Sequence, residues 1–273
     1  MIPFQDNIPS VRSPVFVLLL IVVNTVVFLY QSTMSPAAEE QFVFRYGLIP
    51  REFSQIGKGP VAVEVPGERL LRRTPLGVVV DQQEPRQVFF QGTFTAAVLP
   101  LLTSMFLHGS WMHLIGNMWF LWLFGDNVED RLGRARFTVL YLASGVGAGL
   151  CQVMVNWDGL VPMIGASGAV AGVLGAYFVT YPHARVLTLV PFFYFFWPIV
   201  ELPAIVFLGL WFLMQFFNAT AALGAPGAEG GVAWWAHVSG FLVGGILMKL
   251  CAPTPRIRHR PKWGELIGKP DWN

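Results

Sequence analysis

The sequence predicts an all-α integral membrane protein with six transmembrane helices and both termini in the cytoplasm. Of its 273 residues, 54% are hydrophobic and only 12% are charged, which is more apolar surface than a soluble fold of this length buries. The apolar residues gather in runs long enough to cross about 30 Å of hydrocarbon at about 1.5 Å per residue. The positive charges gather in alternate loops, as expected for helices that cross back and forth.

Six apolar runs define one integral membrane domain over residues 1–273. The first run, 14–31, carries no charge and is longer than a usual signal-peptide core, so we expect an uncleaved anchor. A long extracytoplasmic loop, 32–103, follows it, and the core segment 104–251 contains the other five spans. These are expected at 104–124, 137–157, 167–181, 202–217 and 234–251.

Loop charges set the predicted orientation. Arg131, Arg134 and Arg136 lie between the second and third spans, and the C-terminal segment 252–273 is basic. The loops before the fourth and sixth spans, 156–166 and 219–233, contain no Lys or Arg. Because positive residues favour the cytoplasmic side, we expect segments 1–13 and 252–273 both to be cytoplasmic.

Three apolar stretches do not fit a spanning helix. Residues 186–200 are interrupted by Pro191 and Pro198, which predicts an interfacial or re-entrant segment. In the long loop, the patches 77–80 and 87–90 are bounded by turn residues and fit either short strands or surface-lying helices. The sequence does not choose between these two.

Composition excludes several classes of function. A net charge of +2 does not favour nucleic acid as a partner. The two cysteines, Cys151 and Cys251, match no zinc or redox spacing, and nothing in the sequence predicts a metal or a cofactor. The lipid bilayer is the first expected partner. Oligomeric state and substrate identity cannot be read from the sequence.

Polar side chains at the start of the second span indicate a site. His108, His113 and Asn117 fall within eleven residues of apolar sequence, and ionisable groups are costly inside a membrane unless they serve a function. His113 and Asn117 are four residues apart, so they share one helical face. His108 is expected either to shape the same site or to anchor the helix at the interface.

The fourth and sixth spans open with a serine and a histidine, Ser167 and His237. Both spans are predicted to start on the non-cytoplasmic side, so the two residues lie at similar depth. A serine hydroxyl is a weak nucleophile and requires an adjacent base. The pair therefore predicts acyl transfer, with Ser167 as nucleophile and His237 as base.

Glycine stripes explain how these two helices approach each other. Gly168, Gly172 and Gly175 lie along the fourth span, and Gly240 and Gly244 along the sixth. Small residues four apart let helix backbones come close in lipid. Close approach is required for a short serine side chain to reach a histidine on another helix.

The attacked carbonyl also needs hydrogen-bond donors for its oxyanion. The second span starts on the same side, so Asn117, His113 and the Ser167 backbone N–H are the expected donors. No Asp or Glu lies near His237 in its span. We therefore expect a catalytic dyad rather than a triad.

At these residues the sequence resembles the rhomboid family of intramembrane serine proteases. The resemblance covers about 104–251 and extends to the loop motif after the second span, Val128-Glu129-Asp130-Arg131-Leu132-Gly133. It rests on His108, His113 and Asn117; on Gly165-Ala166-Ser167-Gly168, in which Gly165 and Gly168 are expected to support the site; and on Ala236-His237 with Gly240 and Gly244.

The resemblance implies a six-helix rhomboid-like bundle, a site opened to water from outside, and single-pass membrane proteins as substrates. It also implies that the first loop lies partly in the outer leaflet, that the fifth span acts as a lateral gate, and that the membrane is a prokaryotic plasma membrane. Position 171 departs from the family pattern, because some members have a tyrosine there and this chain has Ala171. What orients His237 is therefore open, with Trp234 or Trp235 as options. The Trp-Arg pair often found in the family's first loop is also absent.

Three other functions compete with proteolysis. A catalytically inactive rhomboid-like protein would bind transmembrane clients without cutting them. Inactive relatives typically lose the serine or the histidine, so the presence of both Ser167 and His237 argues against this function. A haem or metal protein would use His113 and His237 as ligands, and it would leave Ser167 unexplained. A transporter would show broken helices and inverted repeats, which the sequence does not display.

Overall fold

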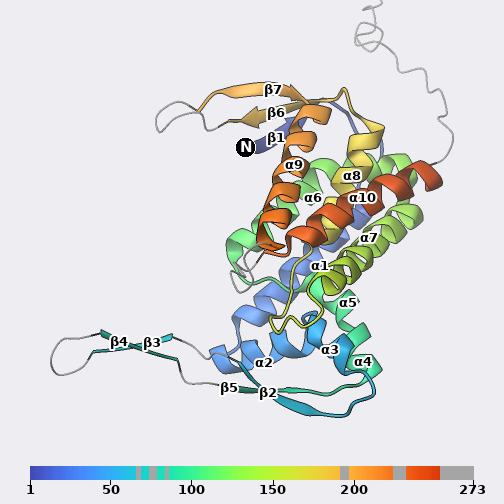
Figure 1. Cartoon of the computed structure of the whole chain (residues 1–273). Helices are drawn as coiled ribbons and strands as arrows, with labels where there is room; N and C mark the ends of the chain where they lie inside the picture. The colour runs from blue at the N-terminus through green and yellow to red at the C-terminus, as the bar shows by residue number, and fades with distance from the viewer. Residues whose placement is uncertain (66–68, 74–78, 84–85, 191–196, 224–231, 253–273) are drawn as a thin grey trace, which may run out of the picture.

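The computed structural model describes residues 1–65, 69–73, 79–83, 86–190, 197–223 and 232–252. The fold is mostly helical, and Figure 1 shows a helical bundle with short strands at both of its ends. The bundle consists of α1 (Val15–Ser32), α6 (Trp111–Leu132), α7 (Arg134–Val155), α8 (Ser167–Thr180), α9 (Ala204–Leu223) and α10 (Trp234–Cys251).

Within the described ranges, four helices are long and apolar enough to cross a membrane, namely α1, α7, α9 and α10. A fifth span is possible if Phe94–Phe106 and α6 count as one, although the chain bends by 78° between them. Helix α8 is apolar but has only 14 residues. At about 1.5 Å per residue it is about 21 Å long, which is shorter than the hydrocarbon core.

The second span differs from its prediction at both ends. We expected 104–124, whereas α6 starts at Trp111 and continues to Leu132. It starts late because Ser110 caps it, with its Oγ accepting from the His113 N–H at 3.2 Å. Side-chain oxygens at this position satisfy N–H groups that have no partner in the helix.

The long loop 32–103 contains both helices and strands. Strand β2 (Val61–Val65) pairs antiparallel with β5 (Arg86–Phe90), and β3 (Arg69–Arg73) pairs with β4 (Val79–Gln83). The patch 87–90 therefore lies in a strand, as do residues 79–80, whereas 77–78 lie outside the described residues. The remaining elements of the loop and the approach to α6 are α2 (Pro36–Tyr46), α3 (Pro50–Gln55), α4 (Phe94–Val98), α5 (Pro100–Thr103) and the 3₁₀ turn η1 (Ser104–Phe106).

A three-stranded antiparallel sheet caps the opposite end of the bundle (Figure 1). Its strands, in spatial order, are β1 (Ile2–Asp6), β6 (Arg185–Leu189) and β7 (Ile199–Pro203). The fold is thus mostly helical, as expected, but the sequence did not predict these strands. The interfacial or re-entrant position of 186–200 stays a prediction, and residues 191–196 lie outside the described residues. The two prolines leave β-branched residues on both flanks, and such residues favour strands. Segment 1–13, for which the sequence predicted only a cytoplasmic location, contributes the third strand.

The sheet is tied to the bundle through Asp6. One of its carboxylate oxygens accepts from the Tyr177 hydroxyl on α8 and from the Asn127 side-chain amide on α6, the latter at 3.0 Å. Burial is the main cause that raises the pKa of Asp6 above its ordinary value. The N-terminal strand therefore places an ionisable group against the helices.

The start of α1 is held by a buried acid on α6. The Glu129 carboxylate accepts from the backbone N–H of Phe16 at 3.1 Å and of Val17 at 2.9 Å. Glu129 is buried, and it lies where the helix dipole favours a negative charge. This contact connects the end of α6 to the first turn of α1.

Helices α8 and α10 form the central seam of the bundle, where the glycine stripes meet. A Cβ atom at Gly240 would collide with the carbonyl oxygen of Gly168, and one at Gly244 with that of Gly172. Since only glycine leaves this space free, the predicted close approach of the two helices is confirmed.

Candidate active site

Ser167 is the first residue of α8, and the turn before it has a conformation that suits glycine. Gly165 has φ of +122°, and its N–H donates to the Ser104 carbonyl at 2.9 Å. Ala166 is the N-cap residue, so the Ser167 N–H lies in the first turn, where N–H groups have no partner within the helix. Ser167 therefore supplies both its hydroxyl and an N–H that is unpaired within the helix, at the N-terminus of α8.

His237 lies in the first turn of α10, on the other side of the seam. Its Nε2 atom is 2.8 Å from the Ser167 Oγ. The start of α10 is held by Gln152 of α7, whose side-chain oxygen accepts from the Ala236 N–H at 3.2 Å. The structure thus brings the predicted nucleophile and base within hydrogen-bonding distance, which general base chemistry requires.

The other ring nitrogen of His237 has a partner that the sequence reasoning missed. Its Nδ1 atom is 2.8 Å from the Oε1 of Gln215 on α9, and Gln215 is only 4% exposed. The Trp211 ring, also on α9, lies 6.2 Å from the imidazole centroid at 33°, and the Trp234 ring lies 6.1 Å away at 86°. Two helices therefore orient the imidazole.

The amide of Gln215 gave one signal in the sequence, because it interrupts the apolar run of the fifth predicted span. The predicted site included serine, histidine and asparagine residues but not Gln215. Of the two tryptophans considered for orienting His237, Trp234 contacts the ring, and the structure adds Trp211. Ala171 packs against α10 instead. A Cβ atom added at Gly240 would lie 3.4 Å from the Cβ atom of Ala171.

His113 lies against the turn that precedes the serine. A Cβ atom at Gly165 would be 2.6 Å from both Cε1 and Nε2 of the His113 ring. Asn117 is buried one turn further along α6, where its side-chain N–H donates to the His113 carbonyl at 3.0 Å. The imidazole therefore borders the serine turn, whereas one amide hydrogen of Asn117 is used within its own helix.

His108 is fully buried before the start of α6. Its backbone is held on both sides by Gln31 of α1, which accepts from the His108 N–H at 3.2 Å and donates to its carbonyl at 3.4 Å. Its ring packs edge-on against His113, with centroids 5.1 Å apart. This placement fits a role in shaping the site better than a role as an interface anchor.

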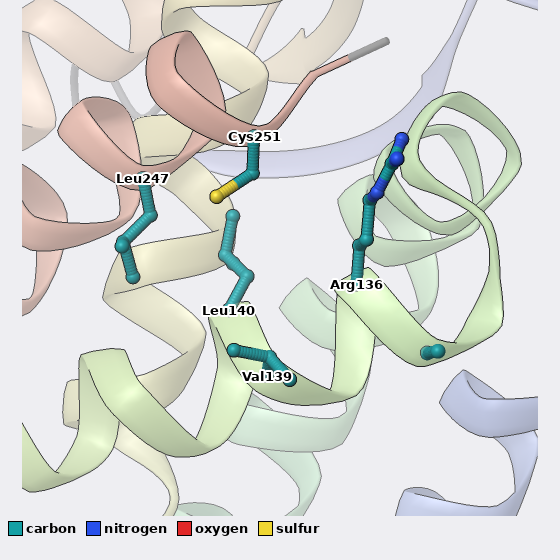
Figure 2. Close-up of a pocket in the computed structure, with 6 residues that line it drawn as sticks. Arg136, Val139, Leu140, Leu247 and Cys251 are labelled. Atoms are coloured by element: carbon teal, nitrogen blue, oxygen red, sulfur yellow. The ribbon is translucent and has the colours of Figure 1, made fainter.

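A separate cavity lies at the other end of α10. Its volume is about 170 Å³. Figure 2 shows residues that line it, among them Arg136 on α7 and Leu247 and Cys251 on α10. The lining is mostly aliphatic, and Ser167 and His237 are not part of it. The cavity is therefore distinct from the serine and histidine site.

The core segment, which contains this site, is similar to known proteins. Residues 95–253 match the model of the rhomboid domain. Presenilin-associated rhomboid-like protein A, mitochondrial, of Danio rerio is 36% identical over 154 residues, which cover 54% of this chain and 36% of that protein. Rhomboid protein 1, mitochondrial, of Saccharomyces cerevisiae is 31% identical over 109 residues, covering 38% of this chain and 32% of that protein.

A plant protein, RHOMBOID-like protein 5 of Arabidopsis thaliana, is 38% identical over 76 residues, covering 28% of this chain and 25% of that protein. The chain matches about a third of the length of the curated relatives or less. The mitochondrial names give no support to a prokaryotic plasma membrane, which stays a prediction. Since the family model matches more than half of the residues, the chain belongs to the rhomboid family.

Proposed function

We propose that this protein is an intramembrane serine endopeptidase that cuts single-pass transmembrane proteins near the outer leaflet. The observation that carries the proposal is the 2.8 Å contact between His237 Nε2 and Ser167 Oγ, two groups on different helices of the central seam. Packing alone requires neither a hydroxyl nor an imidazole at this place, and a nucleophile within reach of its base is the arrangement that acyl transfer needs.

The reaction follows from this geometry. As the Ser167 Oγ attacks the substrate carbonyl carbon, its proton passes to His237 Nε2. The carbonyl oxygen becomes an oxyanion, for which the Ser167 N–H, His113 and Asn117 are the proposed donors. The imidazolium then gives its proton to the departing amine, which leaves an acyl group on Ser167. Water, deprotonated by His237, releases the new carboxylate and restores the hydroxyl.

Six spans are proposed, with α8 counted as the fourth despite its length. Its 14 residues reach about 21 Å of the roughly 30 Å of hydrocarbon. If its C-terminal end lies at one boundary, Ser167 lies about 9 Å inside the other. An even number of spans agrees with the charged loops and with two cytoplasmic termini.

Both nitrogens of His237 have hydrogen-bond partners, Ser167 and Gln215. A haem or metal ligand would need one of these nitrogens free to bind the iron or metal. This observation favours the dyad over the ligand function. An inactive, client-binding protein would have the same contacts, so it is separated from the protease only by experiment.

The test is cleavage in liposomes. The purified chain is reconstituted with a model single-pass substrate, and fragments are followed by gel and mass spectrometry. We expect cleavage by the native chain and none by Ser167→Ala or His237→Ala. Matched controls are Ser239→Ala, which removes a serine hydroxyl from α10, and His183→Ala, which removes an exposed imidazole. Equal cleavage by Ser167→Ala would refute the mechanism. Substrate binding without cleavage by the native chain would support the client-binding function instead.

A further inference from the structure

Helix α9 contributes a buried amide to the serine and histidine site. Gln215 lies in the middle of a 20-residue apolar helix and is 4% exposed. Burying an amide in apolar surroundings is costly unless it forms a hydrogen bond. Its Oε1 contacts His237 Nδ1 at 2.8 Å, so a hydrogen bond to the imidazole compensates for its burial.

We infer that Gln215 is a positioning residue, which fixes the tautomer and the ring orientation of His237 through its side-chain carbonyl. The inference rests on the proposed function and adds a third member to the expected dyad. An imidazole can accept the serine proton at Nε2 only when its other nitrogen, Nδ1, carries the hydrogen. A carbonyl at Nδ1 accepts that hydrogen and selects this tautomer. The lone pair of Nε2 then faces Ser167 Oγ.

The chemistry of the partner matters because an amide is neutral. A carboxylate at this position would also accept from Nδ1–H, but it would stabilise the imidazolium with a full negative charge. An amide selects the tautomer without adding a charge to the interior of the bundle. Trp211, on the same helix as Gln215, lies beside the ring, so α9 supplies both a polar and an aromatic contact to the base.

The test compares Gln215→Leu and Gln215→Glu with the native chain in the liposome cleavage assay, over a range of pH. We expect Gln215→Leu to lower kcat by roughly ten- to hundredfold with little change in KM, which is a part of the roughly hundred- to ten-thousandfold that general base catalysis supplies. We expect Gln215→Glu to recover activity at alkaline pH, with the acid limb of its profile moved up by about one pH unit or more. Asn218→Leu removes another amide of α9 and should match the native chain.

A second readout does not depend on cleavage. The ¹⁵N spectrum of labelled imidazoles, with His237 assigned by its loss in His237→Ala, reports which nitrogen carries the hydrogen. We expect the Nδ1–H form in the native chain and a mixture of tautomers in Gln215→Leu. A native tautomer ratio, or a native kcat and pH profile, in Gln215→Leu would overturn the inference while leaving the protease function intact. Absence of cleavage by the native chain, with the expected tautomers, would refute the protease function alone.

Discussion

The imidazole of His113 lies so close to Gly165 that a Cβ atom there would be 2.6 Å from its Cε1 and Nε2 atoms. Gly165 also has φ of +122°, a conformation that L side chains rarely adopt. The residue two positions before the serine therefore sets both the course of the chain and the position of a proposed oxyanion donor. Both the positive φ and the nearby His113 ring therefore require glycine at this position.

Gly165→Ala is accordingly expected to reduce cleavage. The methyl group displaces the His113 ring, and a misplacement of about 1 Å can cost about a hundredfold in rate. The measurement is kcat of purified protein in liposomes, together with its thermal midpoint. The matched control is Gly116→Ala on α6, because a Cβ there meets no atom within 4 Å. A native kcat in Gly165→Ala would show that cleavage does not depend on the position of the His113 ring.

Glu129→Gln is expected to destabilise the fold with little direct effect on chemistry. The carboxylate accepts from the first N–H groups of α1, and hydrogen bonds to a charged acceptor contribute about 1.5–3 kcal/mol. The free energy of unfolding in detergent, compared with that of Glu64→Gln on an exposed strand position, measures the effect. An unchanged stability would mean that water or another acceptor satisfies these N–H groups.

The stability of the fold should depend on the charge of Asp6. Because its pKa is raised in the folded protein, the folded state favours the protonated form. The stabilisation from this group is complete below the ordinary carboxyl value of about 3.9 and is lost as pH rises through the raised pKa. The thermal midpoint of the native chain should therefore fall, relative to that of Asp6→Asn, as pH rises through this window. Parallel curves for the two proteins would contradict the expectation.

The exposed thiol of Cys251 provides a test of orientation. It ends α10 beside the cavity of Figure 2. If the C-terminus is cytoplasmic, a membrane-impermeant maleimide should label Cys251 in inverted vesicles and not in right-side-out cells. The Cys151→Ser background removes the other thiol, and permeabilised cells supply the positive control. Labelling of intact cells would reverse the predicted topology.

Much of the helical architecture could be predicted from composition. The apolar run of the sixth span gave the bounds of α10, Trp234–Cys251, because a membrane demands continuous apolar length. The approach of α8 and α10 followed from glycines at helical spacing. The strands were harder, since β6 and β7 are apolar segments whose periodicity does not separate a strand from an interfacial segment. The pairing of β6 with β1 joins residues more than 170 positions apart.

The sequence by itself determined which side chains could react, because a serine, histidines and an asparagine inside apolar helices are too costly to be incidental. Tertiary structure decided what holds them. The bond from Gln215 to His237 joins α9 to α10, and the contact of His113 with Gly165 joins α6 to the turn before α8. No local pattern predicts such contacts, since they depend on how each helix is rotated about its axis. Only the packing of the whole bundle fixes that rotation.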